Sequence, residues 1–394
     1  MRTPCGLRTV VTILEIFAEL LGDTFGKVPC YNTIENWVKK LGLSVYQDEQ
    51  PCKDKKFAMV VDESIAINGQ KLLLTFAIPS EHQNRPIKHE DVTILDISVS
   101  KGFNGDDVQG RIEEAEKSAG NAPDYIISDN GHNLTKGITG SGHIRHADIS
   151  HSMGVILKKV YEKQSDFVEF TTLLGKKRLQ YHLTDKAYLL PPNMRAISRF
   201  MNMSSWVFWG NEMLDCYDTL PEKMQEAYAF IKDYESLLKE LQAVLCAVRH
   251  IEAICKNEGF SVMTSRKCKL YVITHVLGNA HSRQARAGIG MLEYLNREEA
   301  FLTGNMSINI SSDIIESTFG IYKSKKSPNK LYGVTSFVLT IPLYPKVSNE
   351  SVTKTINFKE RIVNVKLKDI STWSTEHLSK NWVTERTKTL RKVS

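Results

Sequence analysis

Two short apolar runs in this chain each end in an aspartate. Phe57–Val61 is followed by Asp62, and Tyr125–Ser128 is followed by Asp129 and the turn residues Asn130-Gly131. An apolar run of this length that is bounded by turn residues predicts a buried strand. Open α/β sheets bind their ligands at the carboxyl ends of their strands. The two runs therefore predict an α/β sheet whose edge carries two carboxylates.

A third acid completes a possible metal site. Glu316 lies in Ser311–Gly320, a segment with a helical pattern. Two Mg²⁺ or Mn²⁺ ions stabilise the attacking and leaving oxygens of a phosphoryl displacement, and such hard cations bind oxygen ligands. We expect Asp62 on the central strand to bridge both ions, Asp129 to hold one and Glu316 to hold the other. Acids at strand ends are also common turn formers, and only the order of elements around all three favours the metal site.

The order of elements is that of an RNase H-like domain, with a mixed sheet flanked by helices. The pattern predicts three strands with hairpin-length connections, then a helix, a strand, a short helix, a strand and a helix. The expected ranges, in that order, are 57–61, 71–78, 92–99, 106–119, 124–128, 133–138, 144–149 and 150–161.

The strand signal nearly vanishes between residues 162 and 308, where helices are expected at 195–202, 221–256 and 270–281. Residues 8–43 predict two helices, the second of which stops at Gly42. This pair fits a helix–turn–helix that reads DNA and equally fits a helical hairpin packed on a neighbour. The expected segments are a helical DNA-binding segment (1–50), the first part of the catalytic domain (51–161), an all-α insertion (162–308), the closing helix of the catalytic domain (309–345) and a weakly packed C-terminal tail (346–394).

Three short motifs resemble those of the DDE transposases of insertion sequences. They are Val60–Glu63, Ile127–Gly131 and Ile314–Glu316, in this order, and the resemblance covers residues 57–330. The expected all-α insertion between the second Asp and the Glu resembles the insertion found in one subgroup of these transposases. That subgroup excises and reinserts its element through DNA hairpins. The spacing of 187 residues, from position 129 to position 316, fits that subgroup.

The resemblance implies a DNA transposase with Asp62, Asp129 and Glu316 as catalytic metal ligands. It implies metal-dependent cleavage at transposon ends and transfer of the freed strand into target DNA. The implied partners are double-stranded terminal inverted repeats, target DNA and a second copy of the chain when DNA is bound. A nuclease of the same fold without strand transfer, and a DNA-binding protein that has lost catalysis, are the alternatives.

Two smaller motifs match only in part. Glu316 and Lys323 occupy the E(6)K half of a Y(2)R(3)E(6)K signature, whose Lys contacts DNA phosphate, while Asn309 and Ser312 stand at its Tyr and Arg positions. His151 retains the His of a C-x-x-H motif found in related enzymes, with Asp in place of the Cys. We expect His151, at the start of a helix near the acids, to position a phosphate or the attacking water. A structural role fits it equally.

Other residues are candidate DNA contacts. The segment 323–330 contains lysines and no acid. These lysines, and two arginines of the insertion, could contact DNA phosphates or form a solvated helix face. Two tryptophans at i, i+3 spacing fit stacking on an unpaired base or ordinary core packing. These candidates are Lys323, Lys325, Lys326 and Lys330, Arg283 and Arg286, and Trp206 and Trp209.

Some titratable residues fit the site less well. A zinc cluster of His143, His146, Asp148 and His151 is disfavoured because alternation along a strand separates these side chains. Glu63 would point away from Asp62, and Asp96 lies inside its strand, so these two acids are rival or supporting groups.

Composition bounds the class of protein. No apolar stretch of the 394 residues reaches the roughly 18–20 residues that a membrane span needs. Seven scattered cysteines without a CxxC pair favour a reducing compartment, so we expect a cytoplasmic protein, associated with the nucleoid if bacterial. The net charge of +6 is compatible with a polyanionic partner.

Overall fold

The computed structural model describes residues 5–48, 51–64, 67, 69–193, 200, 203–278, 282–304, 306–326, 333–348, 350–380 and 382–393. The chain forms two compact units. The first comprises residues 1–81, 86–146 and 312–394, and the second comprises 82–85 and 147–311. This division gives residues 147–161 to the helical unit, whereas the sequence pattern assigns them to the catalytic domain.

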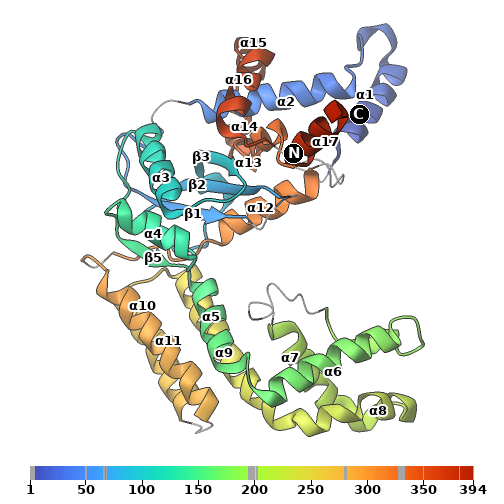
Figure 1. The fold of residues 1–394 in the computed structure, drawn as a ribbon, viewed down its shortest axis with the longest axis vertical. Helices are drawn as coiled ribbons and strands as arrows, with labels where there is room; N and C mark the ends of the chain where they lie inside the picture. Colours follow the sequence, from blue (N-terminus) through green and yellow to red (C-terminus); the bar gives the residue numbers. More distant parts are fainter. Residues whose placement is uncertain are drawn as a thin grey trace. The chain divides into compact units, whose positions relative to one another are not determined.

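The sheet unit is built on a five-stranded mixed sheet (Figure 1), as the strand pattern predicts. Its strands are β1 (Phe57–Glu63), β2 (Lys71–Pro79), β3 (Thr93–Ser100), β4 (Ile126–Ser128) and β5 (Arg145–Ala147). Their order is β3-β2-β1-β4-β5. β2 is antiparallel to β1 and β3, and β4 is parallel to β1. The central strand is therefore β1, which carries Asp62.

The sheet is buried because its strands are apolar on both faces. The first five residues of β1 are all buried, as is typical of a strand covered on both sides. Helix α3 (Gly105–Ala119) begins at Asn104, whose side chain accepts hydrogen bonds from the backbone N–H groups of Asp106 and Asp107. Together with α4 (His132–Gly140), α3 contributes apolar side chains to the core beneath β1.

The helix predicted to stop at Gly42 is longer than expected. Helices α1 (Leu7–Leu21) and α2 (Tyr31–Tyr46) form as predicted, but α2 continues past Gly42. A Cβ at position 42 would lie only 1.8 Å from the carbonyl oxygen of Leu339, in the short 3-10 helix η8 (Ser336–Thr340). Gly42 thus permits close packing against η8, and the stop predicted there is wrong.

We expect Gly42→Ala to lower the free energy of unfolding by about 3 kcal/mol, because the added methyl group forces α2 away from η8. Gly110→Ala is the matched control, since a Cβ at Gly110 in α3 would meet nothing within 4 Å. This control is expected to stabilise by about 0.5–1 kcal/mol. Urea unfolding of both variants measures the difference, and equal effects would contradict the packing argument.

The described residues of the expected C-terminal tail are mostly helical, and part of them packs on the sheet unit. This region forms α13 (Leu343–Ser348), α14 (Glu350–Thr355), α15 (Phe358–Asn364), α16 (Leu367–His377) and α17 (Trp382–Val393). Both α15 and α16 contact α2, and Trp373 of α16 is buried. The N–H of Ser379 donates to the carbonyl of Val99, which attaches the chain after α16 to the edge strand β3.

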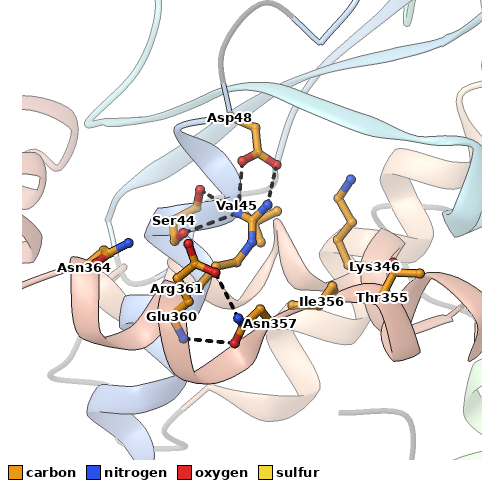
Figure 2. Close-up of a pocket in the computed structure, with 10 residues that line it drawn as sticks. All are labelled: Ser44, Val45, Asp48, Lys346, Thr355, Ile356, Asn357, Glu360, Arg361 and Asn364. Atoms are coloured by element: carbon orange, nitrogen blue, oxygen red, sulfur yellow. Dashed lines mark hydrogen bonds and ion pairs between the residues drawn. The ribbon is translucent and has the colours of Figure 1, made fainter.

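An arginine fixes α15 to the end of α2. The Nη1 of Arg361 donates to Asp48 Oδ1 at 2.9 Å and to the carbonyl of Ser44 at 3.1 Å (Figure 2). Beside this ion pair lies a pocket of about 470 Å³, lined also by Lys346 and Glu360. Leu41 and Val45 on the apolar face of α2 pack against Leu343 of α13. Such packing is compatible with a helical hairpin packed on a neighbour. That α1 and α2 bind DNA stays a prediction.

The described residues of the second unit are helical apart from their connections and a single bridge between Phe260 and Ile308. The helices are α5 (Ile149–Tyr161), α6 (Ser165–Tyr181), α7 (Met203–Cys216), α8 (Glu222–Tyr228), α9 (Glu235–Asn257), α10 (Val262–Val272) and α11 (Ser282–Ala300).

Two of the helices predicted in this unit differ from the structure. The single helix expected at 221–256 is divided into α8 and α9 by a 3-10 turn at Ala229–Tyr234. The helix expected at 270–281 is the end of α10 and a π-turn at Ile273–Leu277, and residues 279–281 lie outside the described residues. The helix expected at 195–202 also lies outside them, except for Phe200.

Among the described residues, none of the helices has both the length and the apolar character needed to cross a membrane.

Candidate active site

Asp62 and Asp129 lie at the carboxyl ends of neighbouring parallel strands. Val61 of β1 is paired with Ser128 of β4, and the two aspartates are the next residues along each chain. Neighbouring strands in a sheet are about 4.8 Å apart. The sheet therefore brings together two residues that are far apart in the sequence, at the edge where the sequence predicts the site.

Backbone N–H groups hold both carboxylates. The N–H of Glu63 donates to Asp62 Oδ1 at 2.7 Å, and the N–H of Gly131 donates to Asp129 Oδ1 at 2.8 Å. A Cβ at position 131 would lie 2.9 Å from the same Asp129 oxygen. Gly131 therefore lets the chain turn closely around the carboxylate, a role that the sequence alone does not reveal.

Arg145 of β5 supports the end of β4. Its Nε donates to Ser128 Oγ at 2.8 Å, and its Nη2 donates to the carbonyl of Asp129 and to Asn130 Oδ1. The guanidinium thus fixes three successive residues and brings a positive charge to this edge of the sheet. Sequence reasoning missed Arg145, although a lone cation in the strand predicted to follow Asp129 was a usable signal.

Glu316 lies on α12 (Asp313–Lys325), the helix predicted to carry it. Helix α12 contacts β1 and buries Ile315 and Phe319, while the side chain of Glu316 is exposed. The buried residues of α12 therefore attach it to the sheet unit and leave the carboxylate on an accessible face, on the helix that contacts the strand of Asp62.

Lys323 connects two of the three acids electrostatically. Burial lowers the pKa of its ammonium group, while the carboxylates of Asp62 and Glu316 act in the opposite direction by favouring the charged form. The Nζ lies 5.6 Å from the centroid of the Phe319 ring. One ammonium group thus interacts with carboxylates from β1 and α12.

His89 contacts the residue next to Glu316. Its Nε2 lies within hydrogen-bond distance of Ser317 Oγ, at 3.3 Å, and its ring packs edge-on against Tyr344. The Nζ of Lys325 lies 5.5 Å from the centroid of the same Tyr344 ring. His89 precedes β3 in the short 3-10 helix η2 (His89–Asp91), where no sequence pattern marked it.

The two rival acids have structural partners. Glu63 forms an ion pair with Lys71 at 2.7 Å. Asp96 is buried, accepts a hydrogen bond from Ser98 Oγ at 2.8 Å and forms an ion pair with Arg111. Both interactions stabilise the sheet and its flanking helix, so neither acid is a better candidate than Asp62.

His151 and Asp148 belong to the helical unit. Asp148 Oδ1 accepts a hydrogen bond of 2.7 Å from the N–H of His151, so this aspartate caps α5. Asp148, which stands at the Cys position of the C-x-x-H motif, therefore caps the helix in this structure. That His151 positions a phosphate or water stays a prediction.

Two of the proposed DNA contacts have structural partners within the helical unit. Trp206 is only 1% exposed and packs against Phe167 and Phe170, so its indole cannot stack on a base in this structure. Arg283 donates twice to Asp166 at 2.7 Å and once to Glu240 at 2.9 Å, which leaves its guanidinium engaged within the unit. Burial favours the core-packing alternative for Trp206, and ion pairing favours a structural role for Arg283. That either residue contacts DNA stays a prediction.

The other proposed contacts remain accessible. Arg286 is exposed, and Trp209 is partly buried with its ring edge-on to Tyr228. Lys325 and Lys326 are partly buried at the end of α12, and Lys330 lies outside the described residues.

The donor set of the site fits a hard divalent cation, since its three side chains offer only carboxylate oxygens. In the part of the chain that the structure describes, no three side chains of His, Cys, Asp or Glu converge closely enough to form a metal-binding group. Neither of the pockets beside the end of α2 is lined by the three acids.

No protein-family model matches this chain, and no curated protein matches it significantly.

Proposed function

We propose that this protein is a DDE transposase with an RNase H-like catalytic domain. The main observation is the arrangement of the acids. Asp62 and Asp129 lie at the carboxyl ends of neighbouring parallel strands, and the helix of Glu316 contacts the strand of Asp62. The central place of β1 and the antiparallel β1-β2-β3 meander support the proposed fold. The resemblance of the three acidic motifs to insertion-sequence transposases supports the chemistry.

In this proposal Asp62, Asp129 and Glu316 would hold two Mg²⁺ or Mn²⁺ ions. Bound there, the ions would supply electrostatic stabilisation of the attacking and leaving oxygens. Arg145 holds the turn that carries Asp129, and the backbone N–H groups of residues 63 and 131 orient the two aspartates. Lys323 would bind a DNA phosphate beside the acids.

The reaction has two stages at one site. Water first breaks the phosphodiester bond at a transposon end and leaves a 3′-hydroxyl group. This hydroxyl then attacks a phosphodiester of target DNA, so that a new bond to the transposon end forms as a target bond breaks. The number of phosphodiester bonds is unchanged in the second stage.

The test uses the full chain and a plasmid that carries the genomic DNA flanking its coding region, with Mg²⁺ or Mn²⁺. The proposal expects cuts at inverted repeats and branched or inserted products joined to a target plasmid. Cuts without joined products would identify a nuclease of the same fold. Binding to the flanking DNA without any cut would identify a DNA-binding protein that has lost catalysis.

Lys323→Ala is expected to weaken binding to this DNA and to lower the slope of log K against log salt by about one, because one phosphate contact is lost. Lys136→Ala is the matched control, since Lys136 is an exposed lysine of the same unit that pairs with Asp106 at 2.8 Å. Fluorescence anisotropy across a salt series measures both slopes. Equal slopes in wild type and Lys323→Ala would show that this ammonium does not contact phosphate.

A further inference from the structure

The end of α6 and the turn after it form a basic segment, residues 176–186. Its cations are Lys176, Lys177, Arg178 and Lys186, with His182 between them and Asp185 as its only acid. Among the described residues, the ion pairs of the helical unit include none of these four permanent cations. Arg178 instead donates to the backbone carbonyl of Pro191. The basic segment therefore carries four cations and one acid, a net positive charge.

Other lysines of the helical unit are different. Lys232 pairs with Asp218, Lys239 with Glu235, and Lys267 with Glu258. Ion pairs with acids are thus common for the lysines of this unit, whereas the lysines of the basic segment form none among the described residues. Like charges that gather without acids repel one another, and binding a polyanion relieves that repulsion.

One tyrosine ring holds two of these cations in place. The Nζ of Lys177 lies 5.3 Å from the centroid of Tyr181, and the Nζ of Lys186 lies 4.8 Å from the same centroid. Tyr181 is itself buried and packs edge-on against Tyr228. Attraction to the ring face offsets part of the repulsion between the two ammonium groups, so both are positioned before any ligand binds.

We propose that the basic segment binds the phosphate backbone of double-stranded DNA, as a second contact surface whose residues belong to the helical unit. Lys176 is exposed on the same helix and adds a third ammonium group. Lysine ammonium groups act as point charges, which suit phosphate contacts and do not distinguish one base sequence from another. This inference rests on the proposed function for its choice of DNA as the polyanion.

Two exposed leucines within the basic segment favour a different partner, an anionic membrane surface. Leu179 and Leu183 are 75% and 86% exposed and lie one turn apart. Cations mixed with exposed apolar side chains also suit an anionic membrane surface. Vesicles that contain phosphatidylserine therefore form the second arm of the experiment.

The experiment compares two triple variants of the full chain, Lys176→Gln/Lys177→Gln/Lys186→Gln and Lys232→Gln/Lys239→Gln/Lys267→Gln. Each variant removes three positive charges. The lysines of the second variant each form an ion pair with an acid in the structure, whereas those of the first do not in the part of the chain that the structure describes. Anisotropy is measured on a random-sequence duplex with EDTA, over about 50–200 mM salt. The first variant is expected to lower the salt slope by about two to three and the affinity at about 100 mM salt by about tenfold, because each lost phosphate contact lowers the slope by about 0.9. The second is expected to change both much less.

Equal losses in the two triple variants, or an unchanged slope in the first, would overturn the proposal. Loss of vesicle binding with an unchanged DNA slope would assign the surface to membranes instead. The single variant Lys176→Gln controls for misfolding, because the Lys176 side chain is exposed and its replacement should leave the fold intact. This variant is expected to lower the salt slope by about one. Binding in EDTA needs no cleavage, so this result and failure of the proposed catalysis are distinguishable.

Discussion

Asp62→Asn, Asp129→Asn and Glu316→Gln are each expected to lower cleavage of the flanking-DNA plasmid by about 10³-fold or more. A metal site that loses one carboxylate loses several kcal/mol of transition-state stabilisation, and each 1.4 kcal/mol is a factor of ten in rate. Binding to the same DNA is expected to persist, because these acids attract no phosphate themselves. Initial rates of nicking and anisotropy on the same preparations measure the two quantities.

Glu63→Gln is the matched control for these three variants. It changes an acid of the same strand, next to Asp62, whose carboxylate is paired with Lys71. It is expected to retain most of the cleavage rate. If the amide variant at position 62, 129 or 316 cleaves as fast as this control, the residue at that position is not a catalytic metal ligand.

The strands and the carboxylate edge were predictable because both are encoded locally. The run Phe57–Val61 is apolar at every position, so its burial between two layers follows from composition. Once β1 and β4 are recognised as neighbours, Asp62 and Asp129 must lie at one edge of the sheet. The contact between α12 and β1 was anticipated only from the order of elements, since a local pattern gives no partner for a helix.

The roles of residues in long-range pairs were not predictable in the same way. Trp206 and Arg283 resemble DNA contacts in sequence, but their partners Phe170 and Glu240 are brought to them by the helical packing. Gly42 was interpreted as a helix stop because glycine is poor in helices. Its true constraint is the backbone of Leu339, almost three hundred residues later in the chain.

The buried pair of Asp96 and Arg111 is expected to respond unequally to loss of either partner. The Asp96 side chain is 4% exposed, whereas that of Arg111 is 25% exposed. Arg111→Ala leaves a buried carboxylate with a hydrogen bond from Ser98 but without its counter-charge, and is expected to cost about 3–5 kcal/mol. Asp96→Ala frees a guanidinium that can reach water, so we expect a smaller cost of about 1–3 kcal/mol.

Urea unfolding of the two single variants and of Asp96→Ala/Arg111→Ala gives the coupling energy between the partners. The double variant is expected to be more stable than Arg111→Ala alone, because it removes the uncompensated carboxylate. Lys136→Ala serves as the exposed comparison: Lys136 and Asp106 are 56% and 80% exposed, and losing that pair is expected to cost less than about 1 kcal/mol. A double variant less stable than Arg111→Ala would mean that Asp96 stabilises the sheet through contacts other than this ion pair.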